Sequence, residues 1–175
     1  MLSVLLVDDN RTFLRILTEF LDFSRVRVTR PRPLDLKEIA RAAVDVVREH
    51  PDCKPAAELT VGGMSTRLEG DEDLLHRVVQ NLVLNAVQAS GLRARVRVEV
   101  REAVPADLPR GVSIEKPVML RVSDNGPGIP PELRDRLFDP FVTGRAGGTG
   151  LGLAIVQRAV QAHRGFVLVD SEPGH

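Results

Sequence analysis

The sequence predicts an α/β fold, a two-layer sandwich in which helices cover one face of a mixed β-sheet. Two observations predict it. Short segments such as Arg95–Arg101 alternate between apolar and polar residues, the two-residue period of a half-buried strand. Other segments, such as residues 71–90, place apolar residues every three or four positions, which is typical of a helix packed on one side. Strands and helices mixed in this order indicate one sheet covered by helices.

Composition narrows the class of protein. The 175 residues allow one domain and a short appendage, and the 24 basic and 24 acidic residues balance to zero net charge. A neutral chain without Trp or Tyr has no general attraction for nucleic acid. No apolar run is long enough to span a membrane, Asp8 and Asp9 interrupt any secretory signal, and Cys53 has no disulfide partner in the chain. We expect a cytoplasmic protein without nucleic-acid partners or membrane insertion.

The chain divides near residue 33. In residues 1–32 the sequence predicts a short strand, a helical extension and a basic linker broken by proline. Residues 33–175 predict the main domain, beginning with a helix that Asp35 caps and that ends near His50. Two strands are then expected, at Ala57–Val61 and Ser65–Glu69, joined by a glycine turn at 62–63.

A long helix capped by Asp71 follows, and it carries a polar stripe opposite its apolar face. The stripe consists of Arg77, Asn81, Asn85 and Gln88. After the strand Arg95–Arg101 and a polar connection at Ala103–Glu115, a strand at Val118–Val122 is expected to place Asp124 at its end.

The last third of the chain alternates helices with glycine-rich segments. A short helix is predicted at Pro131–Phe138, a glycine-rich loop at Thr143–Gly152 and an apolar helix at Leu153–Ala162. A final strand is expected at Phe166–Val169. This strand would leave one sheet edge without a partner, a liability for aggregation or for pairing with another chain.

Two glycine-rich segments suggest a nucleotide site. Asp124 at a strand end, with Gly126 and Gly128 directly after it, lets backbone approach a flat polar ligand, and its carboxylate can accept a hydrogen bond from an exocyclic amine such as that of adenine. An ordinary tight turn is the alternative. The segment 147–153 precedes a helix, where free backbone N–H groups suit phosphate; a flexible loop with a helix cap is its alternative.

The asparagines of the polar stripe form the third candidate. Asn81 and Asn85 lie one helical turn apart, so their amides point the same way and can share a ligand. Amide oxygens are hard ligands, and Mg²⁺ bound to nucleotide phosphates takes one or two protein oxygens plus water. Solvated surface asparagines are the alternative interpretation.

Taken in order, these segments resemble the four motifs of the histidine-kinase ATP-binding domain. The matching motifs are Asn81-x3-Asn85-Ala86, Asp124-x-Gly126-x-Gly128, Leu137-Phe138-Asp139-Pro140-Phe141 and Gly148-Thr149-Gly150-Leu151-Gly152-Leu153. The domain belongs to the GHKL superfamily, shared with gyrase, the ninety-kilodalton heat-shock chaperone and the mismatch-repair ATPase. The resemblance covers about residues 33–174, and the nitrogen-regulation type of sensor kinase is the most similar type.

The resemblance implies ATP and Mg²⁺ as cofactors and a role for each matching residue. Asn85 would coordinate Mg²⁺ with Asn81 as its partner, and Asp124 would recognise adenine. The remaining expected nucleotide contacts are Gln88, Gly126, Gly128, Ile129, Phe138, Phe141, Thr143, Arg145, Gly148, Thr149, Gly150, Leu151, Gly152 and Leu153. Arg145, in the flexible lid, would neutralise the γ-phosphate, with a solvated arginine as the alternative. Gln88 stands where many relatives carry lysine, which implies a weaker phosphate contact.

Asn81 also bears on mechanism. ATPases of the superfamily carry a glutamate at this position, and a carboxylate can activate water as a general base whereas an amide cannot. The resemblance therefore implies transfer of the γ-phosphoryl group to a protein side chain, with little hydrolysis. Positioning and charge stabilisation carry most of the catalysis in such a transfer.

The chain departs from the family in its acceptor. The histidines are His50, His76, His163 and His175, and none lies where the phosphoacceptor of a dimeric hairpin would stand. His163 ends the helix after the glycine loop, where a positive charge would suit the helix dipole. We expect the dimerisation-phosphoacceptor domain and a response regulator to act in trans, a homodimer to be possible, and no autophosphorylation of the isolated chain.

The two ends of the chain are unusual for the family. Residues 4–10, with Asp8 and Asp9, resemble the opening of a response-regulator receiver, while Thr12–Arg25 resembles the end of a kinase hairpin helix. At the other end, relatives continue into a last strand that this sequence does not contain.

Two other functions remain open from the sequence. An anti-sigma-factor type of serine kinase shares the nucleotide motifs, and a supplied hairpin or receiver substrate would discriminate it. A non-catalytic nucleotide-binding or dimerisation module would bind ATP without transferring phosphate.

Overall fold

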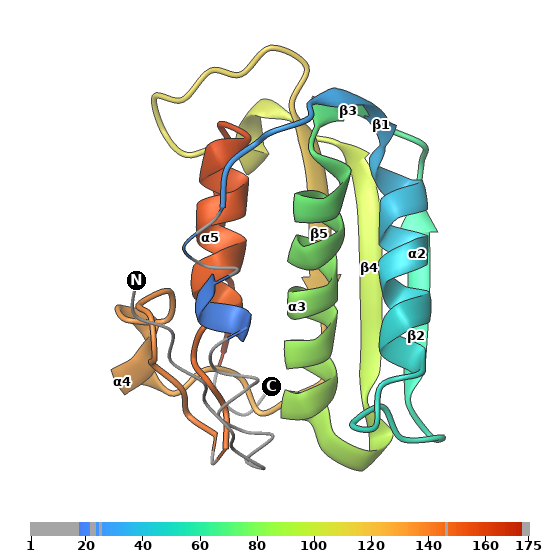
Figure 1. Cartoon of the computed structure of the whole chain (residues 1–175), viewed down its shortest axis with the longest axis vertical. Coiled ribbons are helices and arrows are strands. Elements are labelled where there is room, and N and C mark those ends of the chain that lie inside the picture. The colour runs from blue at the N-terminus through green and yellow to red at the C-terminus, as the bar shows by residue number, and fades with distance from the viewer. Residues whose placement is uncertain (1–17, 22–23, 25, 146, 173–175) are drawn as a thin grey trace, which may run out of the picture.

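The computed structural model describes residues 18–21, 24, 26–145 and 147–172. In this part of the chain, α3 lies between α2 and α5, and the main sheet runs behind α2 and α3 (Figure 1). This arrangement confirms the predicted α/β sandwich. The elements are β1 (Arg32–Asp35), α2 (Leu36–Arg48), β2 (Glu58–Gly63), β3 (Arg67–Gly70), α3 (Glu72–Ser90), η1 (Gly91–Arg93), β4 (Arg95–Glu102), η2 (Pro105–Asp107), β5 (Val118–Ser123), α4 (Pro131–Arg134) and α5 (Gly152–Ala162).

The main sheet has three strands in the order β2-β4-β5. β2 runs parallel to β4, and β5 runs antiparallel to it, so the sheet is mixed as predicted. The alternation of β4 turns Val96, Val98 and Val100 into the core, where each is at most 2% exposed. They pack there against residues of α2 and α3 such as Val44 and Val83.

The prediction of a hairpin at residues 57–69 is wrong. β3 pairs antiparallel with β1 in a separate two-stranded sheet, while β2 pairs with β4. Gly63 is the last residue of β2, with φ +86°, and a Cβ added there would lie 1.9 Å from the carbonyl oxygen of Val100. Glycine is therefore required because β2 passes close to β4, and the 62–63 pair makes no hairpin turn.

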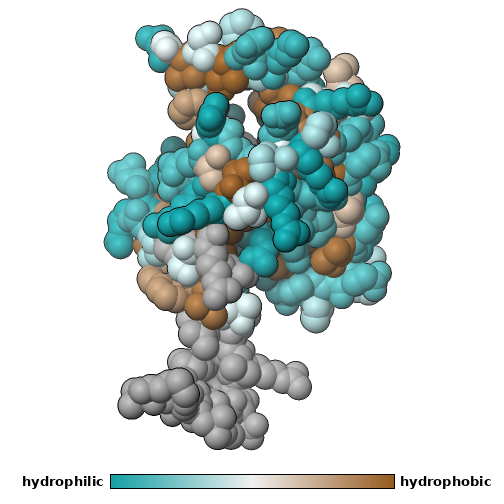
Figure 2. All heavy atoms as spheres, turned by 45° about the horizontal axis from the view of Figure 1, so that its top comes forward, coloured by the Kyte–Doolittle hydropathy of each residue, from teal (hydrophilic) through white to brown (hydrophobic). Residues whose placement is uncertain are grey.

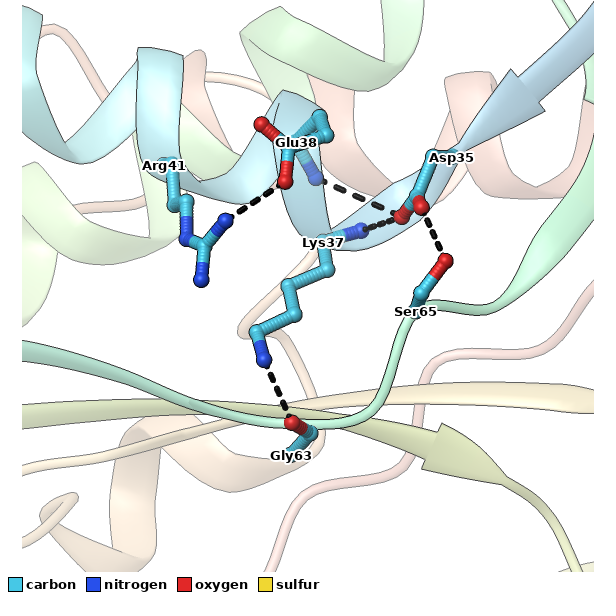
Figure 3. Close-up of polar contacts among 6 residues, drawn as sticks. All are labelled: Asp35, Lys37, Glu38, Arg41, Gly63 and Ser65. Carbon is cyan, nitrogen blue, oxygen red and sulfur yellow. Dashed lines mark hydrogen bonds and ion pairs between the residues drawn. The ribbon is translucent and has the colours of Figure 1, made fainter.

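The start of α2 is held by a polar network around Asp35 (Figure 3). Its Oδ1 accepts hydrogen bonds from the backbone N–H of Lys37 at 2.8 Å and of Glu38 at 3.4 Å, which confirms it as the predicted N-cap. The hydroxyl of Ser65 donates to Oδ2, and Lys37 Nζ donates to the carbonyl of Gly63 over 2.6 Å. The Ser65 bond is the largest cause that lowers the pKa of Asp35.

Asp71, 6% exposed, caps α3 and also holds the preceding linker. Its Oδ1 accepts from the N–H of Leu74 at 3.3 Å, and its Oδ2 accepts from the N–H groups of Thr29 at 3.0 Å and Arg30 at 3.3 Å. Burial by itself would raise the pKa of Asp71, but these hydrogen bonds outweigh it and the pKa is lowered. The linker is thus tied to the main domain by one carboxylate.

The helix α5 packs on α3 through Val156 and Ala159, which lie against Val78. At its end, Nε2 of His163 accepts the backbone N–H of Asp71 at 2.9 Å, and Nδ1 lies 2.7 Å from the carbonyl of Ala159. The accepting Nε2 requires a neutral ring with its proton on Nδ1. The expected positive charge at this helix end is therefore wrong.

Two further predictions in the last third of the chain need correction. The helix expected at Pro131–Phe138 ends at Arg134 and continues as turns. The segment Phe166–Val169 forms no strand, and the side chains of Phe166 and Leu168 are 53% and 64% exposed. A strand needs a neighbouring strand to hydrogen-bond, and in the described residues β5 forms no ladder with this segment.

The surface in Figure 2 is largely hydrophilic, with hydrophobic residues interspersed among charged ones. No helix in the described ranges is both long enough and apolar enough to cross a membrane. The receiver-like start with Asp8 and Asp9 lies outside the described residues, and so do His175 and all of Thr12–Arg25 except Thr18–Leu21 and Ser24.

Candidate functional site

The polar stripe of α3 faces the beginning of α5. A Cβ added at Gly152, the first residue of α5, would lie 3.5 Å from Oδ1 of Asn81 and 3.7 Å from Nδ2 of Asn85. Both asparagines are half-buried. The structure thus brings two of the expected motifs together, because the helical spacing of four residues puts both amides on the same side of α3.

The N-terminus of α5 is open to an anion. Its N-cap residue, Leu151, gives the first turn no side-chain cap, so the first backbone N–H groups have no side-chain acceptor there. Leu151 is fully buried and fixes the loop to the core. The helix α5 has 11 residues, and its uncapped N-terminus lies beside two amides. Such an N-terminus suits the phosphates of a nucleotide.

The glycine loop is held against the segment that carries Phe138 and Phe141, two of the expected nucleotide contacts. The N–H of Phe141 donates to the carbonyl of Gly150 over 3.0 Å. Gly150 has φ +69°, and a Cβ there would lie 2.5 Å from the carbonyl carbon of Phe141, so only glycine fits. Phe141 itself is 58% exposed, and Phe138 is half-buried.

Asp124 lies at the other end of the stripe, one residue beyond β5. Its Oδ1 accepts the N–H of Gly126 at 2.7 Å and lies 3.5 Å from Oγ of Ser90, in the last turn of α3. A Cβ added at the buried Gly126 would lie 2.7 Å from that oxygen and 3.3 Å from Cβ of Ala89. The absence of a side chain at Gly126 therefore keeps the carboxylate close to α3 and exposed to a ligand.

The neighbouring Asn125 was not among the expected site residues. Its Oδ1 accepts the N–H of Arg95 at 2.7 Å, and its Nδ2 donates to the carbonyl of Arg93 at 3.2 Å. These bonds fix the Asp124 loop to the start of β4. The only signal in the sequence is an asparagine before glycine, which indicates a turn and no partner.

The same loop is held from the C-terminal side. Gly128 has φ +77°, and the N–H of Ile129 donates to Oγ of Ser171 over 2.8 Å. Arg134 donates to the carbonyl of Ser171. Ile129 is thus placed by Ser171, which was not among the expected site residues.

A cavity of about 440 Å³ opens beside the last turns of α3. Gln88 lines it from α3, Arg145 and Gly147 line it from the lid, and Asp52 and Lys54 line it from the loop after α2. Gln88 Nε2 donates to Oδ2 of Asp52 at 2.5 Å. This bond is the main cause that lowers the pKa of Asp52, and the nearby charges of His50, Arg145 and Lys54 lower it further.

The lid is a tight turn in the described residues. The N–H of Arg145 donates to Oγ1 of Thr143 at 3.1 Å, and the N–H of Gly148 donates to the carbonyl of Arg145 at 3.1 Å. The Arg145 side chain is exposed and lies beside the cavity. The hydroxyl of Thr149 donates to the carboxylate of Glu19, so the described part of the N-terminal extension contacts the glycine loop.

The expected residues therefore fall into three groups along α3. Asn81, Asn85 and Gly152 lie together, Gln88 shares the cavity with Arg145, and Asp124 lies with Gly126 at the helix end. Leu151 is a core residue, and Leu153 is half-buried in the first turn of α5. Their contacts with a nucleotide stay predictions.

The donor set fits a cation held mainly by a nucleotide. Among the described residues, no three His, Cys, Asp or Glu side chains are grouped for a metal ion. The amide of Asn85, next to the open N-terminus of α5, can supply one oxygen, which suits Mg²⁺ carried on phosphates and water.

Comparison with known proteins identifies the family. Residues 70–175 match the family described as histidine kinase-, DNA gyrase B- and HSP90-like ATPase. The sensory histidine kinase/phosphatase NtrB of Rhodobacter capsulatus is 32% identical over 99% of this chain and 49% of its own length. The histidine-protein kinase AtoS of Escherichia coli is 32% identical over 92% of this chain and 25% of its own length. The chain thus spans at most about half of these relatives.

Solved structures agree with these relatives. A mycobacterial sensor histidine kinase, MprB, is 30% identical with a TM-score of 0.63, covering 77% of this chain and 81% of its own. The full-length kinase ShkA, solved in complex with AMPPNP, is 25% identical with a TM-score of 0.72, covering 98% of this chain and 38% of its own. The chain belongs to the histidine kinase-, DNA gyrase B- and HSP90-like ATPase family, as an ATP-binding catalytic domain of the sensor histidine kinase type resembling the nitrogen-regulation kinases.

Proposed function

We propose that this chain binds Mg-ATP along α3 and transfers the γ-phosphoryl group to a histidine of a dimerisation-phosphoacceptor domain, from which a response regulator would take it. The observation that carries the proposal is the meeting of the Asn81 and Asn85 amides with Gly152 at the uncapped start of α5. The complex of ShkA with AMPPNP, an analogue of ATP by its name, supports an adenine nucleotide as the ligand.

In the proposed site, the residues have separate tasks. Asp124 accepts a hydrogen bond from the adenine amine, while Gly126 and Gly128 let the ring approach the backbone. The N-terminal N–H groups of α5 hold phosphate oxygens, and Asn85 supplies an oxygen to Mg²⁺. Mg²⁺ on the nucleotide would stabilise the negative charge of the phosphoryl group in the transition state of transfer. Arg145, exposed beside the cavity, adds a cation.

Asn81 makes transfer to a protein more favourable than hydrolysis. Its side chain faces Gly152 and occupies the position of the general base in the ATPases of the superfamily. An amide cannot accept the proton of an attacking water. The phosphoryl group is therefore kept for a nucleophile that arrives already competent, such as an imidazole nitrogen.

The test is a transfer assay with a supplied acceptor. The chain is incubated with Mg²⁺, ATP labelled on its γ-phosphate and a dimerisation hairpin domain from a related kinase. We expect acid-labile, base-stable label on the hairpin and little free phosphate. Release of phosphate at a rate equal to or above transfer, or nucleotide binding with no transfer to any hairpin offered, would contradict the kinase assignment.

A further inference from the structure

The loop between α2 and β2 lies outside every recognised motif, yet it forms one wall of the cavity beside α3. Its backbone is fixed by turns: the N–H of Cys53 donates to the carbonyl of His50 at 2.8 Å, and that of Ala57 donates to the carbonyl of Lys54 at 2.9 Å. Cys53 and Ala57 also pack against the main core. The Lys54 side chain is therefore presented from a firmly held backbone, while the residue itself is exposed.

The cavity has a distinctive charge arrangement. Lys54 and Arg145 bring two cations from parts of the chain far apart in sequence, and Asp52 is the only carboxylate among the described residues that line it. The Asp52 carboxylate is engaged by the Gln88 amide at 2.5 Å. One carboxylate cannot neutralise two cations, so the cavity keeps an excess of positive charge where an anion can enter.

The position of the cavity along α3 matters as much as its charge. Gln88 follows Asn85 by three residues and directly precedes Ala89, whose Cβ faces Gly126. The cavity thus lies beside the last turn of α3 and extends past its end, to Gly91 and Leu92. Gln88, which lines the cavity, lies one helical turn from Asn85, where the terminal phosphates are expected.

We propose that Lys54, together with Arg145, binds the polyphosphate of the nucleotide, so that the loop after α2 completes the phosphate wall of the site. The inference rests on the proposed function and adds a phosphate-binding residue to it. Lys54 Nζ donates to the carbonyl of Pro51 at 3.1 Å, within its own loop. An ammonium has three donors, so Lys54 can contact phosphate while it keeps this hydrogen bond.

Asp52 has a positioning role in this arrangement. By accepting from Gln88, it keeps the amide of that side chain on the loop side of the cavity. Replacement of Asp52 by asparagine removes the one negative charge found among the described lining residues. We therefore expect Asp52→Asn to bind ATP more tightly, a change opposite in sign to that of the lysine variant.

The experiment compares Lys54→Gln with Lys116→Gln, a matched change of an exposed lysine in the connection before β5. Displacement of a fluorescent ATP analogue gives affinities for Mg-ATP and for adenosine, at low and at moderate salt. We expect Lys54→Gln to lower the affinity for ATP about fivefold, the effect of one partly screened charge. The affinity for adenosine should change by less than about twofold. The loss should shrink as salt is added, and Lys54→Arg should restore ATP affinity.

Two results would overturn the inference while the proposed function stands. One is an ATP affinity of Lys54→Gln equal to that of Lys116→Gln. The other is an equal loss for ATP and adenosine, since that would indicate a structural role of the loop. Failure of the unmodified chain to bind ATP would contradict the proposed function itself and this inference with it.

Discussion

The backbone N–H of Asp71 donates to Nε2 of His163 over 2.9 Å, across 92 residues of sequence. This bond joins the N-cap residue of α3 to the C-cap residue of α5. α3 carries the asparagines, and α5 follows the glycine loop. A Cβ at Gly70 would lie 3.1 Å from the same ring, so the packing there is close. The relative position of the two halves of the nucleotide site therefore depends on this histidine.

Replacement of His163 should destabilise the chain. His163→Ala leaves the N–H of Asp71 without its acceptor next to a buried carboxylate, and the loss of such a bond lowers the free energy of unfolding by about 1–2 kcal/mol. Urea denaturation measures the change, with Gln161→Ala, an exposed change on the same helix, as the control. Equal midpoints for the two variants would show that the bond contributes nothing.

Gly126 should be essential for recognition of the base. A methyl group there would lie 2.7 Å from Asp124 Oδ1 and would push the carboxylate away from α3. We expect Gly126→Ala to lower the affinity for ATP about tenfold, which corresponds to the loss of one hydrogen bond to a charged group. Gly62→Ala is the matched control, because its nearest neighbour would be the Val98 carbonyl at 4.0 Å. Normal ATP affinity in Gly126→Ala would exclude the assigned role of the loop.

The polar connection before β5 should respond to acid. Two hydrogen bonds from Arg101, at 2.7 and 2.8 Å, and one from the N–H of Val104 lower the pKa of Asp107 from 3.8 to about 2. Because the folded pKa is the lower one, the stabilisation is complete above pH 3.8 and is lost as the pH falls through about 2. NMR titration of the Asp107 carboxyl measures this directly. Titration near 3.8 would show that the pair with Arg101 does not form in solution.

Glu19 should oppose nucleotide binding. Its carboxylate accepts the Thr149 hydroxyl on the glycine loop, so it places a negative charge where phosphates are expected. We expect Glu19→Gln to raise the affinity for ATP about threefold, because it removes one screened charge of the same sign as the ligand. Glu132→Gln, on the exposed helix α4, provides the control. Weaker ATP binding by Glu19→Gln would show that the contact supports the site.

Local patterns predicted much of the fold, and long-range partners account for the errors. The alternation of Arg95–Arg101 predicted β4, and the caps Asp35 and Asp71 were identified because their bonds lie within three residues. The glycine pair at 62–63 suggested a turn because glycine is typical of turns. Its actual cause, the close approach of Gly63 to Val100, is a long-range contact that the sequence does not show. Phe166–Val169 is a short apolar run, which suggests a strand, but in the described residues no strand pairs with it.

The candidate site divides in the same way. The motifs gave Asn85, Asp124 and the glycine loop, since their residue types and spacing carry the chemistry. Lys54 and Ser171 reach the site through folding alone: one lines the cavity with Gln88, and the other holds Ile129. No periodicity or composition marks such residues before the structure is known.

The central claim is that Mg-ATP binds along α3, with Asn85 supplying an oxygen to the metal ion. Isothermal calorimetry with ATP, with and without Mg²⁺, tests it on the unmodified chain and on Asn85→Ala. The account predicts Mg²⁺-dependent binding that Asn85→Ala loses, while both proteins unfold at similar urea concentrations. No binding by the unmodified chain, or undiminished Mg²⁺-dependent affinity in Asn85→Ala, would contradict it.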